Sequence, residues 1–366
     1  MLVTTFFFIV GLLLLLFGAS ALVSGASKLS LSLGVSPLVI GLTVVAFGTS
    51  APEMAVTVGA VLDGTGDVAV GNIVGSNIFN ILVVLGLSAI VIPLSVHTQV
   101  IRQEMPIMLG SGLLLLLMSL NKVISLFEGL LLVALLIAYT VFLIVQAKRS
   151  SAQDAHEYDD EIKRPEPGQL LSRWYVQVLL VVAGLAMLVL GSKWLVASAV
   201  TYARYFGLSE LVIGLTIVAA GTSLPEVATS VAAAIKGERD MAVGNVVGSC
   251  VFNTLGGIGL AGIAAGFSGL AVPPSALNFD LWVMLAAFVA CLPVFLSGRE
   301  IARWEGALFF AYYLAYVAYL ILRSQDHEVL PVFSTAVLSF VIPLTVVTFM
   351  VLTWRQRKKI PGQHSD

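Results

Sequence analysis

Long runs of apolar residues, separated by short polar stretches, dominate the pattern of this sequence. A helix needs about 20 predominantly apolar residues to cross the ~30 Å hydrocarbon core of a bilayer. By that measure the pattern predicts eleven membrane-spanning helices. We place them near residues 5–24, 35–61, 69–93, 104–120, 123–146, 175–198, 209–235, 241–266, 279–297, 304–323 and 330–353. The sequence therefore predicts an all-α integral membrane protein.

Two of these runs contain glycine and proline near their middle, at Gly48–Pro52 and Gly221–Pro225. Because proline lacks an N–H and clashes with the preceding turn, we expect both helices to be interrupted there. Carbonyl groups near residues 46–49 and 219–222 would then be free to face a polar cavity. One clearly hydrophilic stretch, 147–173, is typical of a flexible linker.

Composition supports a membrane protein. The 366 residues are 58% hydrophobic and only 11% charged, with a mean hydropathy of +1.01. A soluble chain of this length needs far more charge to cover its surface. Residues 1–23 contain no Lys or Arg, so the first run predicts a membrane helix and not a cleaved signal peptide. The two cysteines lie in apolar runs and suggest neither a disulfide framework nor a zinc site. No enzyme motif is evident, so we expect a protein that is not an enzyme.

The distribution of Lys and Arg predicts the orientation in the membrane. With the N-terminus outside, fifteen of these residues fall on the cytoplasmic side: Lys28, Arg102, Lys148, Arg149, Lys163, Arg164, Arg173, Lys236, Arg239, Arg299, Arg303, Arg355, Arg357, Lys358 and Lys359. Only Lys122, Arg204 and Arg323 fall outside, and Lys193 lies within a span. Cytoplasmic loops are enriched in Lys and Arg, so we expect a multi-pass protein of the cell (inner) membrane with its C-terminus in the cytoplasm.

The chain contains two copies of one motif pair. Shifted by 173 residues, GLTVVAFGTSAPE (41–53) aligns with GLTIVAAGTSLPE (214–226), and DVAVGNIVGSNIFN (67–80) aligns with DMAVGNVVGSCVFN (240–253). From 41 to 80, 24 of 40 ungapped pairs are identical, which indicates an internal duplication. Each copy holds five spans, and because five is odd the second copy crosses the membrane in the opposite sense.

This duplication divides the chain into four predicted parts. They are a first five-helix repeat (1–146), a cytoplasmic hydrophilic linker (147–173), a second, inverted five-helix repeat (174–325), and an eleventh helix with a basic cytoplasmic tail (326–366). The predicted fold is thus ten transmembrane helices in two inverted repeats plus one C-terminal transmembrane helix.

Each repeat places one acid within a span, Glu53 and Glu226. An unpaired carboxylate at the bilayer centre costs at least ~2.5–3.5 kcal/mol on insertion scales. A structural ion pair is one explanation, but Lys193 is the only basic residue within a span and could serve one of them at most. Two equivalent acids without basic partners favour a bound cation. Hard oxygen ligands without His or thiolate suit Ca²⁺, which takes 6–8 oxygens.

The second motif of each copy adds neutral polar groups. Asn72, Ser76 and Asn80 are spaced at i, i+4 and i+8, so they share one helical face, as do Asn245, Ser249 and Asn253. Glycines 71, 75, 244 and 248 recur at four-residue spacing and let these helices approach neighbours closely. A packing face alone would also explain the pattern, but its recurrence beside the Glu motif favours ion ligands. Neutral oxygens suit a monovalent cation.

These paired motifs resemble G-[ST]-[ST]-x-P-E and G-N-x-x-G-S-x-x-x-N of the calcium/cation antiporter superfamily, and the chain looks closest to prokaryotic sodium/calcium exchangers. The resemblance implies cation sites at the repeat interface, with Ca²⁺ held by Glu53, Glu226 and the backbone of Thr49 and Thr222. It implies Na⁺ or shared ligands at Ala46, Ser50, Ser76, Asn80, Ala219, Ser223, Ser249 and Asn253. Spans 1 and 6 would form a sliding gate. Many relatives carry Asp at the position of Asn253, and its absence here disfavours potassium co-transport.

The resulting hypothesis is a secondary antiporter that exchanges Na⁺ for Ca²⁺ by alternating access. An H⁺-coupled or K⁺-dependent Ca²⁺/cation antiporter is the alternative, and a passive cation channel is a further one. Inverted repeats with interrupted helices favour a carrier over a channel. The expected partners are Ca²⁺, Na⁺ and the lipid bilayer, with no cofactor, no nucleic acid and no obligate protein partner.

Overall fold

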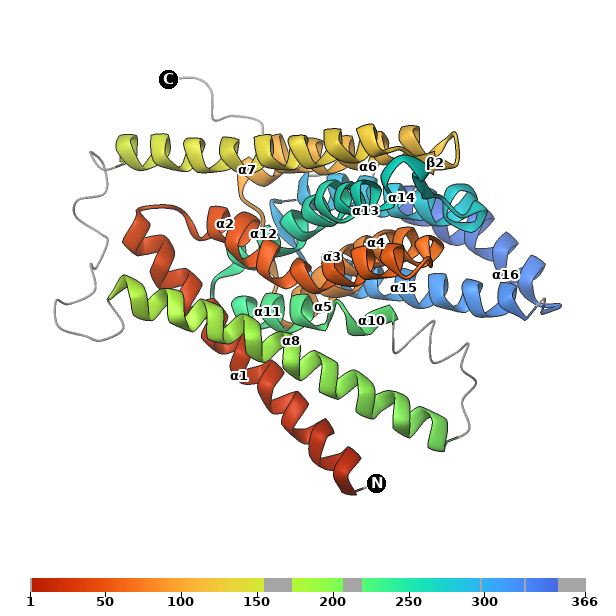
Figure 1. Ribbon diagram of the computed structural model, residues 1–366, viewed down its shortest axis with the longest axis horizontal. Coiled ribbons are helices and arrows are strands. Elements are labelled where there is room, and N and C mark those ends of the chain that lie inside the picture. Colours follow the sequence, from red (N-terminus) through yellow and green to blue (C-terminus); the bar gives the residue numbers. More distant parts are fainter. Residues whose placement is uncertain (1, 155–172, 207–218, 297, 326, 348–366) are drawn as a thin grey trace.

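The computed structural model describes residues 2–154, 173–206, 219–296, 298–325 and 327–347 (Figure 1). Within these ranges, ten helices are long and apolar enough to cross a membrane, and the shorter apolar helix Leu224–Ile235 is the described part of a further predicted span. The predicted linker residues 155–172, the segment 207–218 of the seventh predicted span, and the tail from 348 onward lie outside the described residues.

The helices and strands follow the duplicated order. The first half contains α1 (Leu2–Leu33), α2 (Pro37–Ile40), η1 (Gly41–Val45), α3 (Ala46–Leu62), α4 (Gly66–Phe79), η2 (Asn80–Leu85), α5 (Gly86–Val91), β1 (Leu94–Ser95), η3 (Val100–Glu104), α6 (Met105–Ser119), β2 (Val123–Ile124) and α7 (Leu126–Asp154). The second half contains α8 (Trp174–Tyr205), α10 (Ala219–Gly221), α11 (Leu224–Ile235), α12 (Arg239–Val251), η6 (Phe252–Gly257), α13 (Ile258–Ala265), η7 (Gly266–Ser268), β3 (Leu270–Ala271), η8 (Ala276–Asp280), α14 (Leu281–Leu296), β4 (Glu300–Ile301) and α15 (Arg303–Ser324). The last described helix comprises α16 (Leu330–Ala336) and η9 (Val337–Val341) and continues to Val347.

The prediction of a break at Gly48–Pro52 is wrong. Helix α3 runs from Ala46 to Leu62 with Pro52 inside it. Proline removes one hydrogen bond, but a long helix packed by neighbours can absorb that loss without ending. The irregularity lies earlier, where Gly41–Val45 is π-helical. In the second half the break is present, because Thr222 and Ser223 form a turn between α10 and α11.

Two short sheets demonstrate that the repeats are inverted. Strand β1 pairs antiparallel with β4, and β2 pairs antiparallel with β3. Strands β1 and β2 flank the fourth span, Val100–Ser119, while β3 and β4 flank its counterpart, Ala276–Leu296. The sheet at which the fourth span begins is therefore the sheet at which its counterpart ends. The two equivalent spans run in opposite directions, as the odd number of spans per repeat predicts.

The backbone beside each sheet repeats the same symmetry. Lys122 and Arg299 are the only described non-glycine residues with positive φ, at 68° and 56°. The carbonyl of Lys122 accepts a bond from the amide of Val272 at 2.9 Å, and that of Arg299 accepts one from Val96 at 2.8 Å. Because the left-handed conformation is unfavourable for these residues, its recurrence at equivalent turns indicates that sheet pairing holds it.

Helices α1 and α8 cross each other through glycines. A Cβ atom on Gly184 would lie 2.6 Å from the amide nitrogen of Leu22, and one on Gly18 would lie 3.0 Å from the carbonyl oxygen of Gly184. Gly11 and Gly191 make the matching approach: a Cβ atom on Gly11 would lie 2.9 Å from the Gly191 carbonyl oxygen, and one on Gly191 would lie 2.8 Å from that of Gly11. Small residues allow such backbone contact in membranes. The two longest helices therefore form one crossed pair along the side of the bundle (Figure 1).

Replacing Gly184 by leucine is expected to lower the stability of the folded protein by about 1–3 kcal/mol, because the added atoms meet backbone that cannot yield easily. Thermal unfolding of the detergent-solubilised protein measures this loss. Gly110 is the matched control, since it is also helical and a Cβ there meets no described atom within 4 Å. Equal melting temperatures for Gly184→Leu and Gly110→Leu would contradict the tight crossing.

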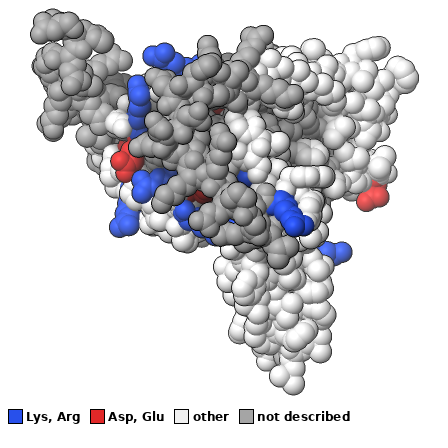
Figure 2. Space-filling view, turned by 90° about the vertical axis from the view of Figure 1, so that its left-hand side faces the viewer, with Lys and Arg blue, Asp and Glu red and all other residues white. Residues whose placement is uncertain are grey.

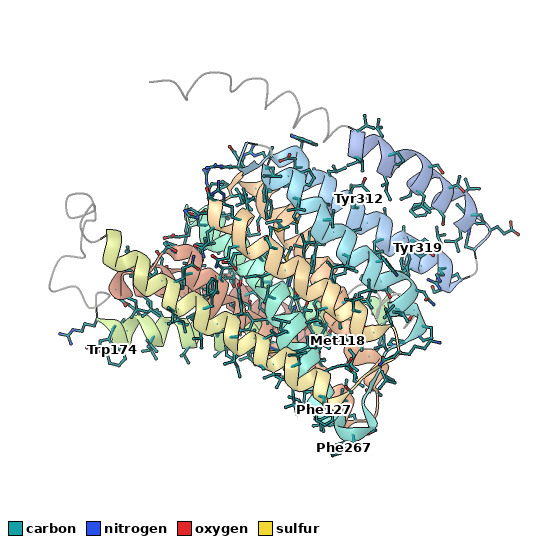
Figure 3. The ribbon with its side chains drawn as sticks, turned by 90° about the horizontal axis from the view of Figure 1, so that it is seen from above. Met118, Phe127, Trp174, Phe267, Tyr312 and Tyr319 are labelled. Atoms are coloured by element: carbon teal, nitrogen blue, oxygen red, sulfur yellow. The ribbon has the colours of Figure 1, made fainter. Side chains whose placement is uncertain are left out.

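The last described helix packs against α15 at its edge. The hydroxyl of Tyr312 donates to the Thr345 hydroxyl at 2.6 Å. Figure 3 places Tyr312 and Tyr319 on α15, Trp174 at one end of the bundle, and Phe127 and Phe267 at the other. Exposed aromatic side chains at both ends of an apolar bundle are typical of a protein that spans a bilayer.

Candidate ion-binding site

The two acids predicted from the sequence meet at the interface of the repeats. Glu53 lies in α3 and Glu226 in the first turn of α11, and both are 0% exposed. The hydroxyl of Ser223 donates to Glu53 Oε1 at 3.1 Å, and that of Ser50 donates to Glu226 Oε1 at 3.4 Å. Each carboxylate is thus bonded by the serine of the other repeat, so the two halves exchange equivalent contacts.

The second oxygen of each carboxylate has no hydrogen-bond partner. Glu53 Oε2 and Glu226 Oε2 are both buried and unpaired. The same is true of nearby motif atoms: Ser76 Oγ, Thr222 Oγ1, and the side-chain oxygen and nitrogen of both Asn80 and Asn253. Buried polar atoms are normally paired, and an ionised carboxylate without a partner is especially unfavourable in an apolar interior. A cluster of such oxygens from both repeats has the chemistry of a cation site.

The alternative explanation of the two acids, a structural ion pair, is not found at this site among the described residues. Lys193, the single basic residue predicted within a span, is exposed and lines a cavity between α8 and α3. Serine hydroxyls bond to both acids, and the Thr49 side chain also bonds to Glu226. Among the described residues, no three His, Cys, Asp or Glu side chains cluster as a metal site. Any cation here would therefore be held by two carboxylates and neutral oxygens.

The two threonines of the motif differ in conformation. Thr49 is helical, and its hydroxyl approaches the Ala46 carbonyl at 3.4 Å, the Asn245 side-chain oxygen at 3.2 Å and the Ser249 hydroxyl at 3.5 Å. Thr222 lies in the turn before α11 with its hydroxyl unpaired. The repeats are therefore alike in sequence but not in local structure.

The asparagine faces turn toward the acid-bearing helices. Asn72 donates to the Thr57 hydroxyl at 3.0 Å and to the Glu53 carbonyl at 3.5 Å. Its counterpart Asn245 donates to the Ser230 hydroxyl at 2.9 Å. These bonds fix the second motif against the first in both repeats. Two turns further on, Asn80 is the first residue of the π-helical segment η2 and Asn253 is the second residue of η6. This distortion is frequent at functional sites.

The two alanines predicted to offer carbonyls occupy equivalent positions. Ala46 is the first residue of α3, and Ala219 is the first described residue after the segment 207–218 and lies in α10. One contact beside the proposed ligands was not predicted. The Ser192 hydroxyl on α8 donates to the Gly221 carbonyl at 2.5 Å. Its counterpart in the first repeat is Ala19, so no repeated motif pointed to it. The bond connects α8 directly to the interrupted helix beside the site.

The predicted close approach at the motif glycines holds for the second repeat. Cβ atoms on Gly244 and Gly248 would lie 2.9 and 2.8 Å from the carbonyls of Leu38 and Leu42. Gly71 and Gly75 meet no described atom within 4 Å. By the repeat, their partners would be residues 211 and 215, which lie outside the described residues.

A second pair of acids was missed by the sequence reasoning. Glu104 is fully buried and accepts a 2.8 Å bond from the Tyr139 hydroxyl, with further bonds from Gln99 and Gln103. Asp280 accepts a 2.9 Å bond from Tyr316 in the equivalent place. Both acids begin a span and both tyrosines lie in the next one. The bonds pair spans within each repeat, away from the central cluster, and the indel between the repeats concealed their equivalence.

Comparisons with known proteins agree with one another. The sodium/calcium exchanger protein family matches residues 3–145 and 176–322. The putative antiporter CaxA of Alkalimonas amylolytica is 40% identical over 329 residues, covering 88% of this chain and 100% of that protein. The sodium/calcium exchanger MaX1 of Methanosarcina acetivorans is 32% identical over 341 residues, covering 85% of this chain and 97% of that protein. A solved structure of the sodium-calcium exchanger NCX_Mj, soaked with zero Na⁺ and Ca²⁺, superimposes with a TM-score of 0.73 at 28% identity, covering 87% of this chain and 99% of that one.

Proposed function

Since this chain belongs to the sodium/calcium exchanger family, we propose that it exchanges Na⁺ for Ca²⁺ across the membrane by alternating access. Membership makes it a cation antiporter. The observation that carries the choice of ions is the cluster of unpaired buried oxygens around Glu53 and Glu226. Two carboxylates match the charge of one Ca²⁺, and neutral oxygens around them match monovalent ions.

In this proposal Ca²⁺ binds between the two acids. Glu53 Oε2 and Glu226 Oε2 supply its anionic ligands, and the backbone oxygens of Thr49 and Thr222 complete the protein's share. Ca²⁺ takes 6–8 oxygens at ~2.3–2.6 Å, and carboxylates can bind it through one or both oxygens. The serine bonds to the other carboxylate oxygens support this arrangement, because they leave one oxygen of each acid free.

Na⁺ would use the neutral groups and share the acids with Ca²⁺. Its proposed ligands are Ser50, Ser76, Asn80, Ser223, Ser249 and Asn253, with the carbonyls of Ala46 and Ala219. Sharing matters for coupling: if both ions need the same carboxylates, they compete, and the loaded site carries one ion type at a time. The amide at Asn253 adds no charge, so this set needs no extra cation such as K⁺ for neutrality.

The orientation follows from charge. Lys and Arg side chains gather on the end of the molecule where α8 begins (Figure 2). Because basic residues favour the cytoplasmic side, we assign that end to the cytoplasm and the N-terminus to the outside. The β1–β4 sheet, which adjoins Arg299, would then face the cytoplasm, and the β2–β3 sheet would face outward.

The test is Ca²⁺ flux into proteoliposomes under separately imposed Na⁺, K⁺ and pH gradients. Na⁺/Ca²⁺ exchange gives uptake that follows the Na⁺ gradient and is unchanged by the other two. Uptake that follows pH and ignores Na⁺ would make the two acids proton acceptors and overturn the coupling. Downhill Ca²⁺ flux without a counter-ion would identify a channel.

A further inference from the structure

Helix α1 is fastened to the loop after α11 by a set of serine contacts. The ammonium of Lys236 donates to the Ser20 carbonyl at 2.7 Å, the Ser20 hydroxyl at 2.8 Å and the Ser24 hydroxyl at 2.6 Å. One turn further along α1, the Ser27 hydroxyl donates to Glu238. An ammonium has three N–H donors, so Lys236 is fully satisfied by α1. We call these contacts the α1 latch.

The equivalent positions in the other half carry opposite chemistry. Shifted by 173 residues, Ser20 corresponds to Lys193 on α8, and Lys236 corresponds to Asp63 at the end of α3. In the α1 latch the long cationic side chain comes from the loop and the short oxygen acceptor from the gate helix. At the equivalent place the gate helix carries the long cation and the loop carries the short acceptor. Lys236 with Ser20 and Lys193 with Asp63 thus each combine one long lysine side chain with one short oxygen-bearing side chain, so the two pairs can span similar distances between helix and loop.

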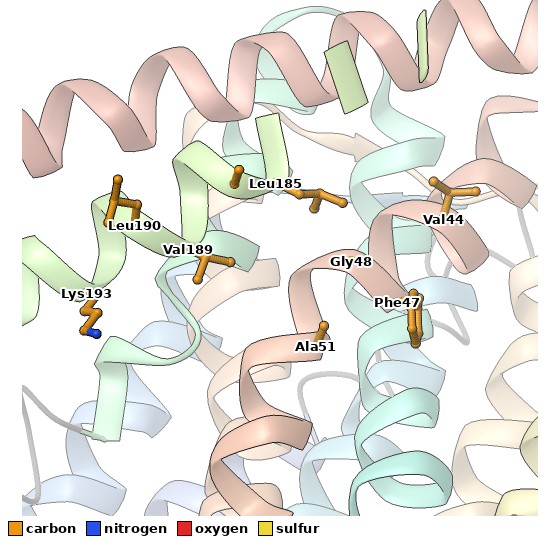
Figure 4. Close-up of a pocket in the computed structure, with 9 residues that line it drawn as sticks. Val44, Phe47, Gly48, Ala51, Leu185, Val189, Leu190 and Lys193 are labelled. Atoms are coloured by element: carbon orange, nitrogen blue, oxygen red, sulfur yellow. The ribbon is translucent and has the colours of Figure 1, made fainter. Parts of the chain in front are cut away.

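The second pair is separated in this structure. Both Lys193 and Asp63 are exposed, and no ion pair joins them. Instead, a cavity of about 710 Å³ lies between α8 and α3, lined by Phe47, Gly48 and Ala51 on one side and by Leu185, Val189 and Lys193 on the other (Figure 4). On the equivalent side of the molecule, α1 packs along α11. The gate helices are therefore in unequal positions: α1 packs along α11, whereas α8 approaches α3 closely only beside Gly48, at Leu185, and borders the cavity elsewhere.

We propose that Lys193 and Asp63 form an ion pair in the opposite conformation of the transport cycle, when α8 closes on α3 and the α1 latch opens. The inference rests on the proposed alternating access, in which inverted repeats exchange their conformations about a fixed site. After that exchange α8 adopts the place relative to α3 that α1 now has relative to α11. Lys193 then reaches Asp63 as Lys236 now reaches Ser20. Lys193 is a positioning residue of the gate.

The pair accounts for three features together. It explains a lysine that partners neither Glu53 nor Glu226, it explains why Asp63 and Lys236 differ in sign at an otherwise repeated position, and it gives the cavity beside Gly48 a role as the space into which α8 closes. Exchange of conformations also requires that the α1 latch and the Lys193–Asp63 pair never form at once. Each state is then held by one of these two contacts.

Paired cysteines test the proposal directly. The variant Asp63→Cys with Lys193→Cys is expected to be bridged by a bis-methanethiosulfonate reagent whose spacer replaces the length of the lysine side chain, because a direct disulfide requires Cα atoms within about 7 Å. The bridge is seen as a mobility shift that reductant reverses. The native Cys250 and Cys291 are fully buried, and wild-type protein controls for them. Asp63→Cys with Leu179→Cys is the matched control, since Leu179 is exposed on the same helix but lies about 21 Å further from its outer end. Absence of the 63–193 bridge would overturn the proposal, and this readout does not depend on which ions are transported.

The two latches should trap opposite states. The pair Ser20→Cys with Lys236→Cys is expected to hold the conformation described here, and the 63–193 pair the opposite one. With each pair bridged by the same reagent, Ca²⁺ binding to right-side-out and inside-out vesicles should therefore be kept on one face by the 20–236 bridge and on the other face by the 63–193 bridge. Binding retained on the same face by both would refute alternation.

Single substitutions test the pair through the ratio of apparent Ca²⁺ affinities at the two faces of the membrane. A side chain that only stabilises the fold would leave this ratio unchanged. Lys193→Ala and Asp63→Ala should each change the ratio of apparent Ca²⁺ affinities at the two faces by about two- to fivefold in one direction, the range expected of an exposed ion pair. Their double variant should change it no further, and Lys236→Ala should change it in the opposite direction. Additive effects of Lys193→Ala and Asp63→Ala, or shifts of the same sign for Lys236→Ala, would contradict the pair.

Discussion

Replacing Glu53 or Glu226 by glutamine is expected to reduce Ca²⁺ exchange by about a hundredfold or more while leaving the fold intact. Glutamine keeps the shape of glutamate but removes its charge, so one carboxylate would remain to balance a divalent ion in a buried site. The resulting excess charge costs at least ~2.5–3.5 kcal/mol at membrane depth, and every 1.4 kcal/mol is about a tenfold change in affinity. Each variant also loses the anionic acceptor for a serine of the other repeat.

The measurement is Na⁺-driven ⁴⁵Ca²⁺ uptake by proteoliposomes containing equal amounts of folded protein. Glu104→Gln is the matched control, because Glu104 is equally buried but bonds to Tyr139 away from the central cluster. It should retain exchange. Wild-type uptake in either site variant, or an equal loss in Glu104→Gln, would remove the basis for the proposed Ca²⁺ site.

Replacing Asn253 by aspartate is expected to slow Na⁺-driven Ca²⁺ exchange by about tenfold or more and to make it depend on a further monovalent cation. The side chain is fully buried and its amide has no partner. A third carboxylate beside Glu53 and Glu226 would leave one negative charge unbalanced when Ca²⁺ is bound, at a cost of the size given above. A proton or K⁺ that binds together with Ca²⁺ would neutralise this unbalanced negative charge.

Exchange measured with and without K⁺, across a range of pH, tests this change. Addition of K⁺ or a lower pH should restore uptake by the aspartate variant and leave the wild type unaffected. Asn253→Ala removes the amide without adding charge, so it should lower the rate without creating any dependence on K⁺. Uptake by Asn253→Asp that equals wild type in Na⁺ alone would show that this position lies outside the ion path.

Much of the fold follows from patterns that repeat along the chain. Apolar runs predicted the spans, and the 173-residue shift predicted two inverted copies, which the pairing of β1 with β4 and β2 with β3 bears out. Helix ends were less predictable. Helix α1 continues to Leu33, nine residues past the predicted end at residue 24, because Gly25, Ala26 and Ser30 are buried against neighbours. Hydropathy alone does not identify helical turns that contain both polar and apolar residues.

The central acids could be anticipated because burying a charge is costly and the motif occurs twice. Contacts that one repeat makes with residues of a different type from those of the other repeat could not be anticipated. The bond from Ser192 to Gly221 and the contacts of Lys236 with Ser20 and Ser24 occur in one repeat only, so no internal comparison reveals them. The continuity of α3 through Pro52 was also missed. The prediction from proline considers only the local backbone, and it leaves out the packing that supports a helix around the lost hydrogen bond.

The two small sheets also constrain the origin of the chain. Each joins a strand of one repeat to a strand of the other, and the same pairing rule generates both. That is the signature of an isologous interface, in which identical subunits offer one another the same surface. Two separate copies of a single repeat, inserted in opposite directions, could form both sheets with one sequence. Such a subunit would need to insert either way round, whereas the fused halves carry loop charges that commit each to one direction, as Asp63 and Lys236 do at equivalent positions.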